Sequence, residues 1–335
     1  MNFDQKKILV IRFSSIGDIV LATSPLKTIR TAHPDAQITF LTLGRFAPLL
    51  EFHPDIDRLI SISGKMSIRQ LWIFSQYIQR NKYDLTYDLH NSLRSNVVTF
   101  NSRSETYQLR KPRWNRMMLF HFHQNYFDPQ FSTRSMYHEH LGPIWNGDHG
   151  AIPPTLLRLS AGELQRGRRF LIDRGVMGDF IAVLPGAAWK QKQWRPERYS
   201  EVLGASDLPS VLIGSKRDKI CADICEGLEN STDLSGQTGL REAMAIIANA
   251  KYVIGSDTGL VHAAEALGKR VSMILGPTST ETGAGVSLAD SVNIEKDIWC
   301  RPCSQNGSTP CYRDRQYCME SITPQEVLGS LDLKL

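Results

Sequence analysis

Short apolar runs alternate with segments of helical spacing along most of this chain. In the first half, β-branched runs predict strands and a period near 3.6 predicts helices, giving strands at 6–13, 36–42, 58–62 and 83–89 and helices at 18–33 and 67–81. The second half repeats the rhythm, with strands at 179–186, 209–215, 250–256 and 270–276 and helices from about residues 196, 218 and 260. Strands joined by crossover helices indicate parallel sheets that are covered on both faces.

A segment rich in glycine and proline, residues 146–160, separates the two series and is typical of a linker. We therefore predict an α/β protein of two doubly wound, Rossmann-like domains that face a central cleft. The predicted domains are residues 1–155 and 156–335, and we leave open that the last helix packs back on the first domain.

Composition narrows the class of protein. The chain has 335 residues, of which 41% are hydrophobic and 22% charged, as is usual for a soluble enzyme. No apolar stretch approaches the roughly 18 residues of a membrane span, and Arg12 and Asp18 interrupt the N-terminal apolar segment, which argues against a signal peptide. We expect a cytoplasmic, monomeric protein, and the net charge of +5 is too small to require a nucleic-acid partner.

One local stretch is strongly basic. Five arginines and lysines lie between residues 103 and 116 against the single acid Glu105, and an aromatic-rich segment follows. Such a stretch can bind an anionic substrate, rest on an acidic membrane surface, or form a solvated loop. The sequence leaves these alternatives open.

Ligands of open parallel sheets bind beyond the carboxyl ends of the strands, so the loops after the strands are the candidate sites. The loop after the first strand contains Ser15, Gly17 and Asp18. An acid there is also a common first-turn residue of a helix, which is the structural alternative for Asp18. The loop after the strand at 179–186 carries Lys190 and Lys192, whose charge suits a phosphate.

Two further loops have similar chemistry. Ser215 follows one strand, and Asp257, Thr258, Gly259 and His262 follow another at the start of a predicted helix. Helix N-termini offer unpaired N–H groups to phosphate. The chain lacks a Gly-x-Gly-x-x-Gly motif after the first strand and lacks a P-loop, which disfavours a dinucleotide oxidoreductase and a P-loop NTPase.

Together these segments carry a family resemblance. The segments 8–26, 83–98, 184–203 and 253–279 and the tail at 300–327 resemble, in the same order, the ADP-heptose:lipopolysaccharide heptosyltransferases of glycosyltransferase family 9. The resemblance implies a GT-B fold, inverting transfer without a metal or other cofactor, and ADP-heptose as donor substrate. It implies that the acceptor is a lipid-linked anionic saccharide of the lipopolysaccharide core, bound by the first domain at the inner face of the cytoplasmic membrane, where peripheral contact is possible.

The resemblance also suggests roles for individual residues. Asp18 matches the proposed general base, Lys192 matches the lysine that contacts the donor diphosphate, and residues 257–259 with His262 match the donor loop. Arg195 departs from the family pattern between Trp194 and Pro196, so Lys190 competes with Lys192 for the phosphate role. The residues that we assign to donor binding also include Ser215, and those that we assign to the acceptor are Ser15, Gly17, His90, Arg94 and Arg113.

Four cysteines in the tail have a metal-site spacing. Cys300, Cys303, Cys311 and Cys318 include one Cys-x-x-Cys pair and form a candidate structural zinc site. The spacing of the last two is loose, which favours the alternative of reduced cysteines that pack as small hydrophobes, and the expected cytoplasmic location argues against stable disulfides.

The leading hypothesis is therefore an inverting heptosyltransferase with Asp18 as base. The alternatives are a family member with another nucleotide-sugar or acceptor, and a catalytically silent nucleotide-sugar-binding module.

Overall fold

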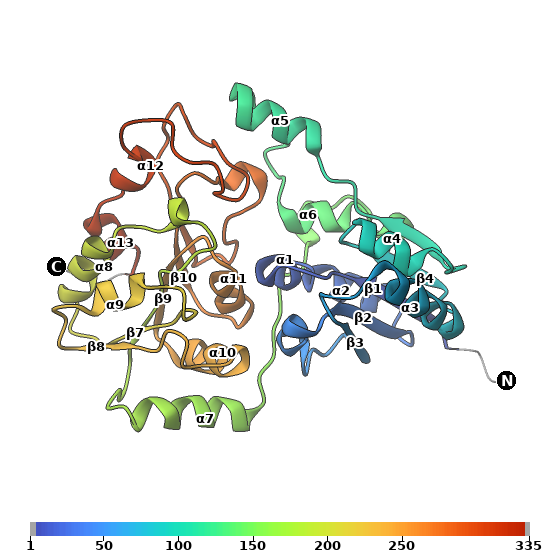
Figure 1. Ribbon diagram of the computed structural model, residues 1–335, viewed down its shortest axis with the longest axis horizontal. Coiled ribbons are helices and arrows are strands. Elements are labelled where there is room, and N and C mark those ends of the chain that lie inside the picture. Colours follow the sequence, from blue (N-terminus) through green and yellow to red (C-terminus); the bar gives the residue numbers. More distant parts are fainter. Residues whose placement is uncertain (1–4, 332–335) are drawn as a thin grey trace. The chain divides into compact units, whose positions relative to one another are not determined.

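A computed structural model of the chain describes residues 5–331 (Figure 1). The chain divides into two compact units, each built on one parallel sheet. The first unit comprises Met1–Lys111 and Thr133–Arg158, and the second comprises Pro112–Ser132 and Leu159–Leu335. The segment 112–132 thus belongs to the second unit, whereas the predicted boundary placed it in the first domain.

The first unit contains a five-stranded sheet whose chain order reverses between β1 and β4. In spatial order its strands are β3 (Arg58–Ile62), β2 (Gln37–Leu43), β1 (Lys7–Ile11), β4 (Leu85–Asp88) and β5 (Glu105–Gln108). Its helices are α1 (Ile16–Leu21), α2 (Ser24–Ala32), α3 (Ile68–Asn81), α4 (Leu93–Thr99) and α6 (Thr133–His138). All neighbouring strands are parallel, as predicted.

The helix predicted at 18–33 is two helices, α1 and α2. Ala22 ends the first, and the Thr23 hydroxyl donates to the Val20 carbonyl oxygen at 2.6 Å. Pro25 lies in the first turn of α2, where its missing N–H costs nothing, but it cannot continue a preceding helix. The break gives the residues around Asp18 a short helix of their own.

The second unit contains a six-stranded parallel sheet whose chain order reverses between β6 and β9. In spatial order its strands are β11 (Val292–Ile294), β10 (Val271–Ile274), β9 (Tyr252–Ser256), β6 (Ile181–Leu184), β7 (Ser210–Leu212) and β8 (Ser231–Asp233). Its helices are α5 (Arg113–Phe122), α7 (Ala161–Ile172), α8 (Pro196–Gly204), α9 (Ile220–Cys225), α10 (Leu240–Asn249), α11 (Gly259–Ala266), α12 (Tyr317–Glu320) and α13 (Pro324–Ser330).

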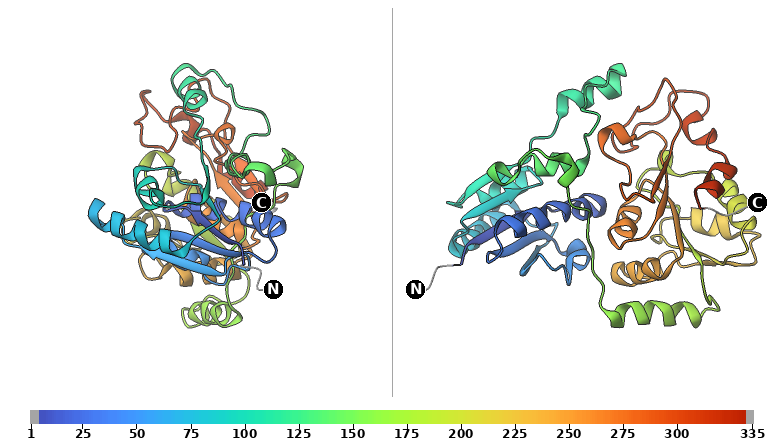
Figure 2. Two further views of the ribbon diagram at one scale, coloured as in Figure 1. Left: turned by 90° about the vertical axis from the view of Figure 1, so that its right-hand side faces the viewer. Right: turned by 180° about the vertical axis from the view of Figure 1, so that it is seen from behind.

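Alternate residues of β6 face two different cores, as the period of two in a strand requires. Ala182 and Leu184 belong to a cluster that includes residues of α10, α11 and α7, and α7 lies along α10 (Figure 2). Ile181 and Val183 belong to a second cluster that includes residues of α8, α9 and α13. The last helix thus contributes to the core of the second unit. Within residues 5–331, no helix is long and apolar enough to cross a membrane.

Gly255 in β9 lies where no side chain fits. A Cβ atom there would stand 2.7 Å from the Leu184 carbonyl oxygen and 2.8 Å from a methyl carbon of Val261 on α11. We expect Gly255→Ala to lower the free energy of unfolding by about 1–3 kcal/mol, as overpacking does, when measured by urea denaturation. Gly329→Ala on α13 is the control, because a Cβ there meets nothing within 4 Å; equal stability of the two variants would contradict this account.

Candidate functional site

The site in the first unit centres on the Asp18 carboxylate, in the third position of α1. Its Oδ2 accepts hydrogen bonds from the backbone N–H of Ser15 at 3.0 Å and from the Ser15 hydroxyl at 2.9 Å. Its Oδ1 lies 2.8 Å from a guanidinium nitrogen of Arg12. One oxygen of Asp18 therefore stabilises the start of the helix, as the structural alternative proposed, and the other forms an ion pair with Arg12.

Arg12 is buried at the end of β1 and is held from two further sides. Its Nη1 donates to the Leu89 carbonyl oxygen at 2.6 Å, just after β4. The guanidinium carbon lies 5.6 Å from the centre of the Tyr137 ring of α6. Since β1 and β4 flank the reversal of chain order, Arg12 and Asp18 lie at the point where open sheets bind ligands.

The electrostatic balance keeps Asp18 ionised. Burial alone would raise the pKa of its carboxyl, but the attraction of Arg12 and the hydrogen bonds from Ser15 outweigh burial and lower it. The side chain nevertheless remains 38% exposed. Asp18 is thus a carboxylate that is fixed in place, charged at neutral pH and open to a substrate hydroxyl.

His90 is a predicted acceptor residue outside α1 whose imidazole interacts electrostatically with both Arg12 and Asp18. It follows β4, where the Asp88 carboxylate accepts its backbone N–H at 3.0 Å, and its ring meets Phe13 edge-on. Burial first, and then the positive charges of Arg12 and Lys111, lower the pKa of His90 to about 4, so the imidazole is neutral at pH 7. Its buried Nδ1 has no hydrogen-bond partner within residues 5–331, which is uncommon for a buried polar atom.

The other predicted acceptor residues have mixed positions. Ser15 and Gly17 form the start of α1, where Ser15 supports Asp18 and Gly17 is buried. Arg94 on α4 donates to the Gly64 carbonyl oxygen at 2.9 Å and stacks on Phe13. Arg113 begins α5, which belongs to the second unit, so it is not among the residues that the first unit gathers around Asp18.

The first unit also contains an open polar pocket of about 540 Å³ that sequence reasoning missed. Its lining includes Asn91, Gln108, Arg110, Glu139 and His140. Two segments of the chain connect this pocket to the Asp18 site. The loop after β4 supplies Asn91 to the pocket and accepts a hydrogen bond from Arg12, and α6, which Glu139 and His140 follow, carries the Tyr137 ring that lies next to Arg12. Amide, guanidinium and carboxylate groups in one pocket can bind several sugar hydroxyls and one anionic group.

The site in the second unit is an ion pair at the end of its central strands. Lys192 Nζ lies 2.6 Å from Asp257 Oδ2, which also accepts a hydrogen bond from the Thr278 hydroxyl at 2.9 Å. The side chains of Lys192 and Asp257 are only 13% and 11% exposed. These residues come from the loops after β6, β9 and β10, and β6 and β9 flank the reversal of chain order in this sheet.

The structure distinguishes Lys192 from Lys190. Both lie in the short 3₁₀ helix Lys190–Lys192, but the Lys190 side chain is exposed, whereas the Lys192 stem packs against Gly307 of the tail. A side chain at Gly307, which has φ +81°, would collide with the Lys192 stem. The tail thus holds Lys192 in place.

The remaining predicted donor residues surround this pair or support it. Thr258 precedes α11 in extended conformation and Gly259 begins the helix, so that its N-terminal N–H groups follow Asp257 directly. His262 is buried one turn further. Ser215 is different, because its hydroxyl donates to Asp218 Oδ2 at 2.7 Å within its own loop.

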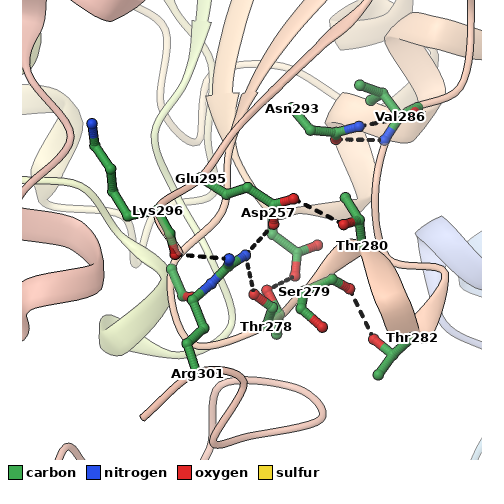
Figure 3. Close-up of polar contacts among 11 residues, drawn as sticks. Asp257, Thr278, Ser279, Thr280, Thr282, Val286, Asn293, Glu295, Lys296 and Arg301 are labelled. Carbon is green, nitrogen blue, oxygen red and sulfur yellow. Dashed lines mark hydrogen bonds and ion pairs between the residues drawn. The ribbon is translucent and has the colours of Figure 1, made fainter. Parts of the chain in front are cut away.

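The site is completed by three residues that the sequence did not single out, Arg301, Glu295 and Ser279. Arg301 donates to the Thr278 carbonyl oxygen at 2.8 Å and pairs with Glu295 (Figure 3). It also donates to the Gly276 carbonyl oxygen at 2.5 Å. It therefore braces the loop that carries Thr278. Ser279, next in that loop, is fully buried and its hydroxyl has no partner within residues 5–331.

The four tail cysteines converge on one small pocket. Cys303 and Cys318 are close enough to the others for neighbouring thiols, after burial, to contribute to the rise in their pKa values. Even so, within residues 5–331 no group of three or more His, Cys, Asp and Glu side chains is arranged to hold a metal ion. The four thiols thus share one pocket, and both the zinc hypothesis and the packed-thiol alternative stay predictions.

The chain matches a known protein family along most of its length. Residues 71–312 match the family model of glycosyltransferase family 9 (heptosyltransferase). Lipooligosaccharide heptosyltransferase 2 of Haemophilus ducreyi is 26% identical over 297 residues, covering 82% of this chain and 84% of that protein. Lipopolysaccharide heptosyltransferase 1 of Pseudomonas aeruginosa is 24% identical and is matched over 98% of both chains.

A solved structure shows the same fold. The Escherichia coli ADP-heptose lipopolysaccharide heptosyltransferase II has a TM-score of 0.75 to this chain at 22% identity, and the match covers 97% of each chain. This likeness confirms the predicted fold class, GT-B with two doubly wound α/β domains.

Proposed function

The chain belongs to glycosyltransferase family 9 (heptosyltransferase) and is a glycosyltransferase, and from this premise we propose that it moves heptose from ADP-heptose to a lipopolysaccharide core or related lipid-linked saccharide. The observation that carries the proposal is that each sheet has one charged site at its own reversal of chain order. One site offers a carboxylate to a hydroxyl, and the other offers a lysine and helix N–H groups to a diphosphate.

The acceptor hydroxyl attacks the anomeric carbon of the donor in a single displacement, which inverts its configuration. As the new C–O bond forms, the hydroxyl proton passes to Asp18 and the bond from the anomeric carbon to the diphosphate breaks, releasing ADP. A carboxylate of low pKa is a weak base toward a free alcohol. It becomes an adequate one late in the displacement, when the attacking oxygen has lost electron density and its proton has become acidic.

Donor binding uses the Lys192 site. Without donor, Lys192 forms an ion pair with Asp257. When the donor binds, its diphosphate also interacts with Lys192 and accepts hydrogen bonds from the N–H groups at the start of α11. Fixed positive charge of this kind stabilises the leaving diphosphate in the transition state. Lys192 and the helix therefore supply the charge that a divalent cation supplies elsewhere, and transfer is expected to persist in EDTA.

The acceptor binds the first unit. The open pocket of this unit has room and polar groups for the acceptor sugar, and Arg110 suits a carboxylate or phosphate on it. His90, next in the chain to Asn91 of that pocket, contributes a neutral imidazole.

A nucleotide screen tests the donor assignment. Calorimetry with ADP, UDP, GDP and CDP is expected to show binding of ADP ahead of the others, followed by heptose transfer when ADP-heptose and a core acceptor are supplied. Preference for UDP would show a family member with another nucleotide-sugar. ADP-heptose binding without turnover or donor hydrolysis would show a silent binding module.

The ion pair predicts a pH dependence. Asp18 must be ionised, so activity is present above its pKa and is lost as the pH falls through that pKa, which Arg12 and Ser15 hold below the ordinary value of an aspartate in the wild type. In Arg12→Gln, burial acts on Asp18 without the compensating charge, so the acid limb of the kcat profile should move to higher pH. Arg12→Lys, which keeps a charge, should move it less. An unchanged limb in Arg12→Gln would contradict the pairing.

A further inference from the structure

Helix α5 exposes large apolar side chains. Trp114 is 54% exposed, Met117 46% and Phe122 60%, while Leu119 of the same helix is buried. Tyr126, which follows the helix, is 52% exposed and its ring lies 4.9 Å from that of Trp114. Exposed apolar residues that occur singly are ordinary, but four within thirteen residues of one helical segment form a patch.

The same segment concentrates positive charge. Arg113 and Arg116 lie on α5 and Lys111 lies just before it, and no Asp or Glu occurs from residue 106 to residue 127. These three cations compare with a net charge of +5 for the entire chain. The partner of this segment is therefore both apolar and anionic.

We propose that α5 docks the enzyme on an anionic lipid bilayer, with Trp114, Met117 and Phe122 inserted at the boundary between headgroups and acyl chains. Trp and Tyr favour that boundary because their rings are apolar and their N–H and O–H groups remain hydrated. Arginine and lysine near an anionic surface each strengthen binding by roughly fivefold. Of the alternatives left open by the sequence, the exposed aromatic residues favour the membrane over a soluble anion, which needs no apolar contact.

The C-terminal end of α5 contacts another segment of the second unit. The His123 ring meets the Trp299 ring edge-on, and Trp299 precedes the cysteine-bearing tail that holds Lys192 in place. Docking through α5 thus places the unit that we propose binds the donor at the surface where a lipid-linked acceptor resides. This inference uses the proposed function only for the nature of the acceptor.

The test is co-sedimentation of the full chain with vesicles. Wild type should sediment with equal parts phosphatidylglycerol and phosphatidylcholine at low salt, much less at high salt, and little with phosphatidylcholine alone. Trp114→Ser/Phe122→Ser should bind the anionic vesicles about tenfold more weakly or worse, since two large side chains no longer leave water. The matched control, Ile172→Ser/Met177→Ser, removes two exposed apolar residues of the same unit that lie near Asp173 and Asp179, and it should bind like wild type.

Three results would overturn the proposal. The first is equal sedimentation of wild type and Trp114→Ser/Phe122→Ser, or equal binding to neutral vesicles. The second is loss of binding in Trp72→Ser/Leu93→Ser instead, since those exposed residues of α3 and α4 belong to the first unit. The third is a wild-type dimer in light scattering that Trp114→Ser/Phe122→Ser abolishes, which would make a second copy the occupant.

Vesicle binding needs no donor and no turnover, so its outcome is separate from that of the proposed function. Transfer to a delipidated, water-soluble acceptor should be equal in wild type and Trp114→Ser/Phe122→Ser. Failure of that transfer in both proteins, with sedimentation as predicted, would reject the function and keep the docking surface.

Discussion

Replacing Asp18 with asparagine is expected to lower kcat by about 10²–10⁴-fold, the usual contribution of a general base. The amide has nearly the shape of the carboxylate and retains an oxygen for the Ser15 N–H, so α1 should remain folded. It cannot accept the acceptor proton. Initial rates of ADP release, with donor affinity from calorimetry, measure the effect, and the affinity for the donor should not change.

Asp57→Asn is the matched control for this prediction. Asp57 also lies in the first unit, pairs with an arginine, Arg30, at 2.6 Å, and is 43% exposed, close to the 38% of Asp18. Asp57→Asn removes an ion pair comparable to that of Asp18, but Asp57 has no role in the proposed proton transfer. The kcat of this variant should therefore stay near the wild-type value. Similar losses in both variants would mean that Asp18 acts through stability rather than as a base.

Replacing Lys192 with alanine is the second change with a large expected effect. We expect kcat/KM to fall by about 10²–10³-fold, as when one fixed donor to a developing charge is removed, together with weaker binding of ADP. The variant also leaves Asp257, a largely buried carboxylate, without its cation, and its charge then repels the diphosphate. Steady-state kinetics measures the fall in kcat/KM, and calorimetry on the same protein measures the loss of ADP affinity.

Lys190→Ala distinguishes the two candidate lysines. Lys190 lies two residues away in the same 3₁₀ helix and is exposed, so its replacement should cost at most a few-fold in kcat/KM. A larger loss in Lys190→Ala than in Lys192→Ala would transfer the phosphate role to Lys190.

The sequence predicted the central strands and the edge strand β3 well, but it missed the edge strands β5, β8 and β11. β1, β6 and β9 are buried on both faces and therefore appear as continuous apolar runs. β5, β8 and β11 lie at or near sheet edges and have only three or four residues, with the sequences Glu-Thr-Tyr-Gln, Ser-Thr-Asp and Val-Asn-Ile. Their pairing depends on the neighbouring strand, which local pattern does not reveal.

The same division applies to the site. Asp18, Lys192 and Asp257 were predictable because each follows a strand. The long-range contacts around them were not, because Leu89, which holds Arg12 next to Asp18, lies 77 positions from Arg12, and Thr278 lies 21 positions from Asp257. One signal was present: an arginine at the end of an apolar strand is a buried charge that requires a partner.

The most direct test is a crystal structure with a donor analogue and an acceptor bound. We expect an Asp18 carboxylate oxygen within about 2.6–3.2 Å of the acceptor hydroxyl, or one water away from it, with the donor diphosphate on Lys192. A closed complex in which Asp18 lies more than about 10 Å from the anomeric carbon, beyond a direct or one-water relay, would contradict it.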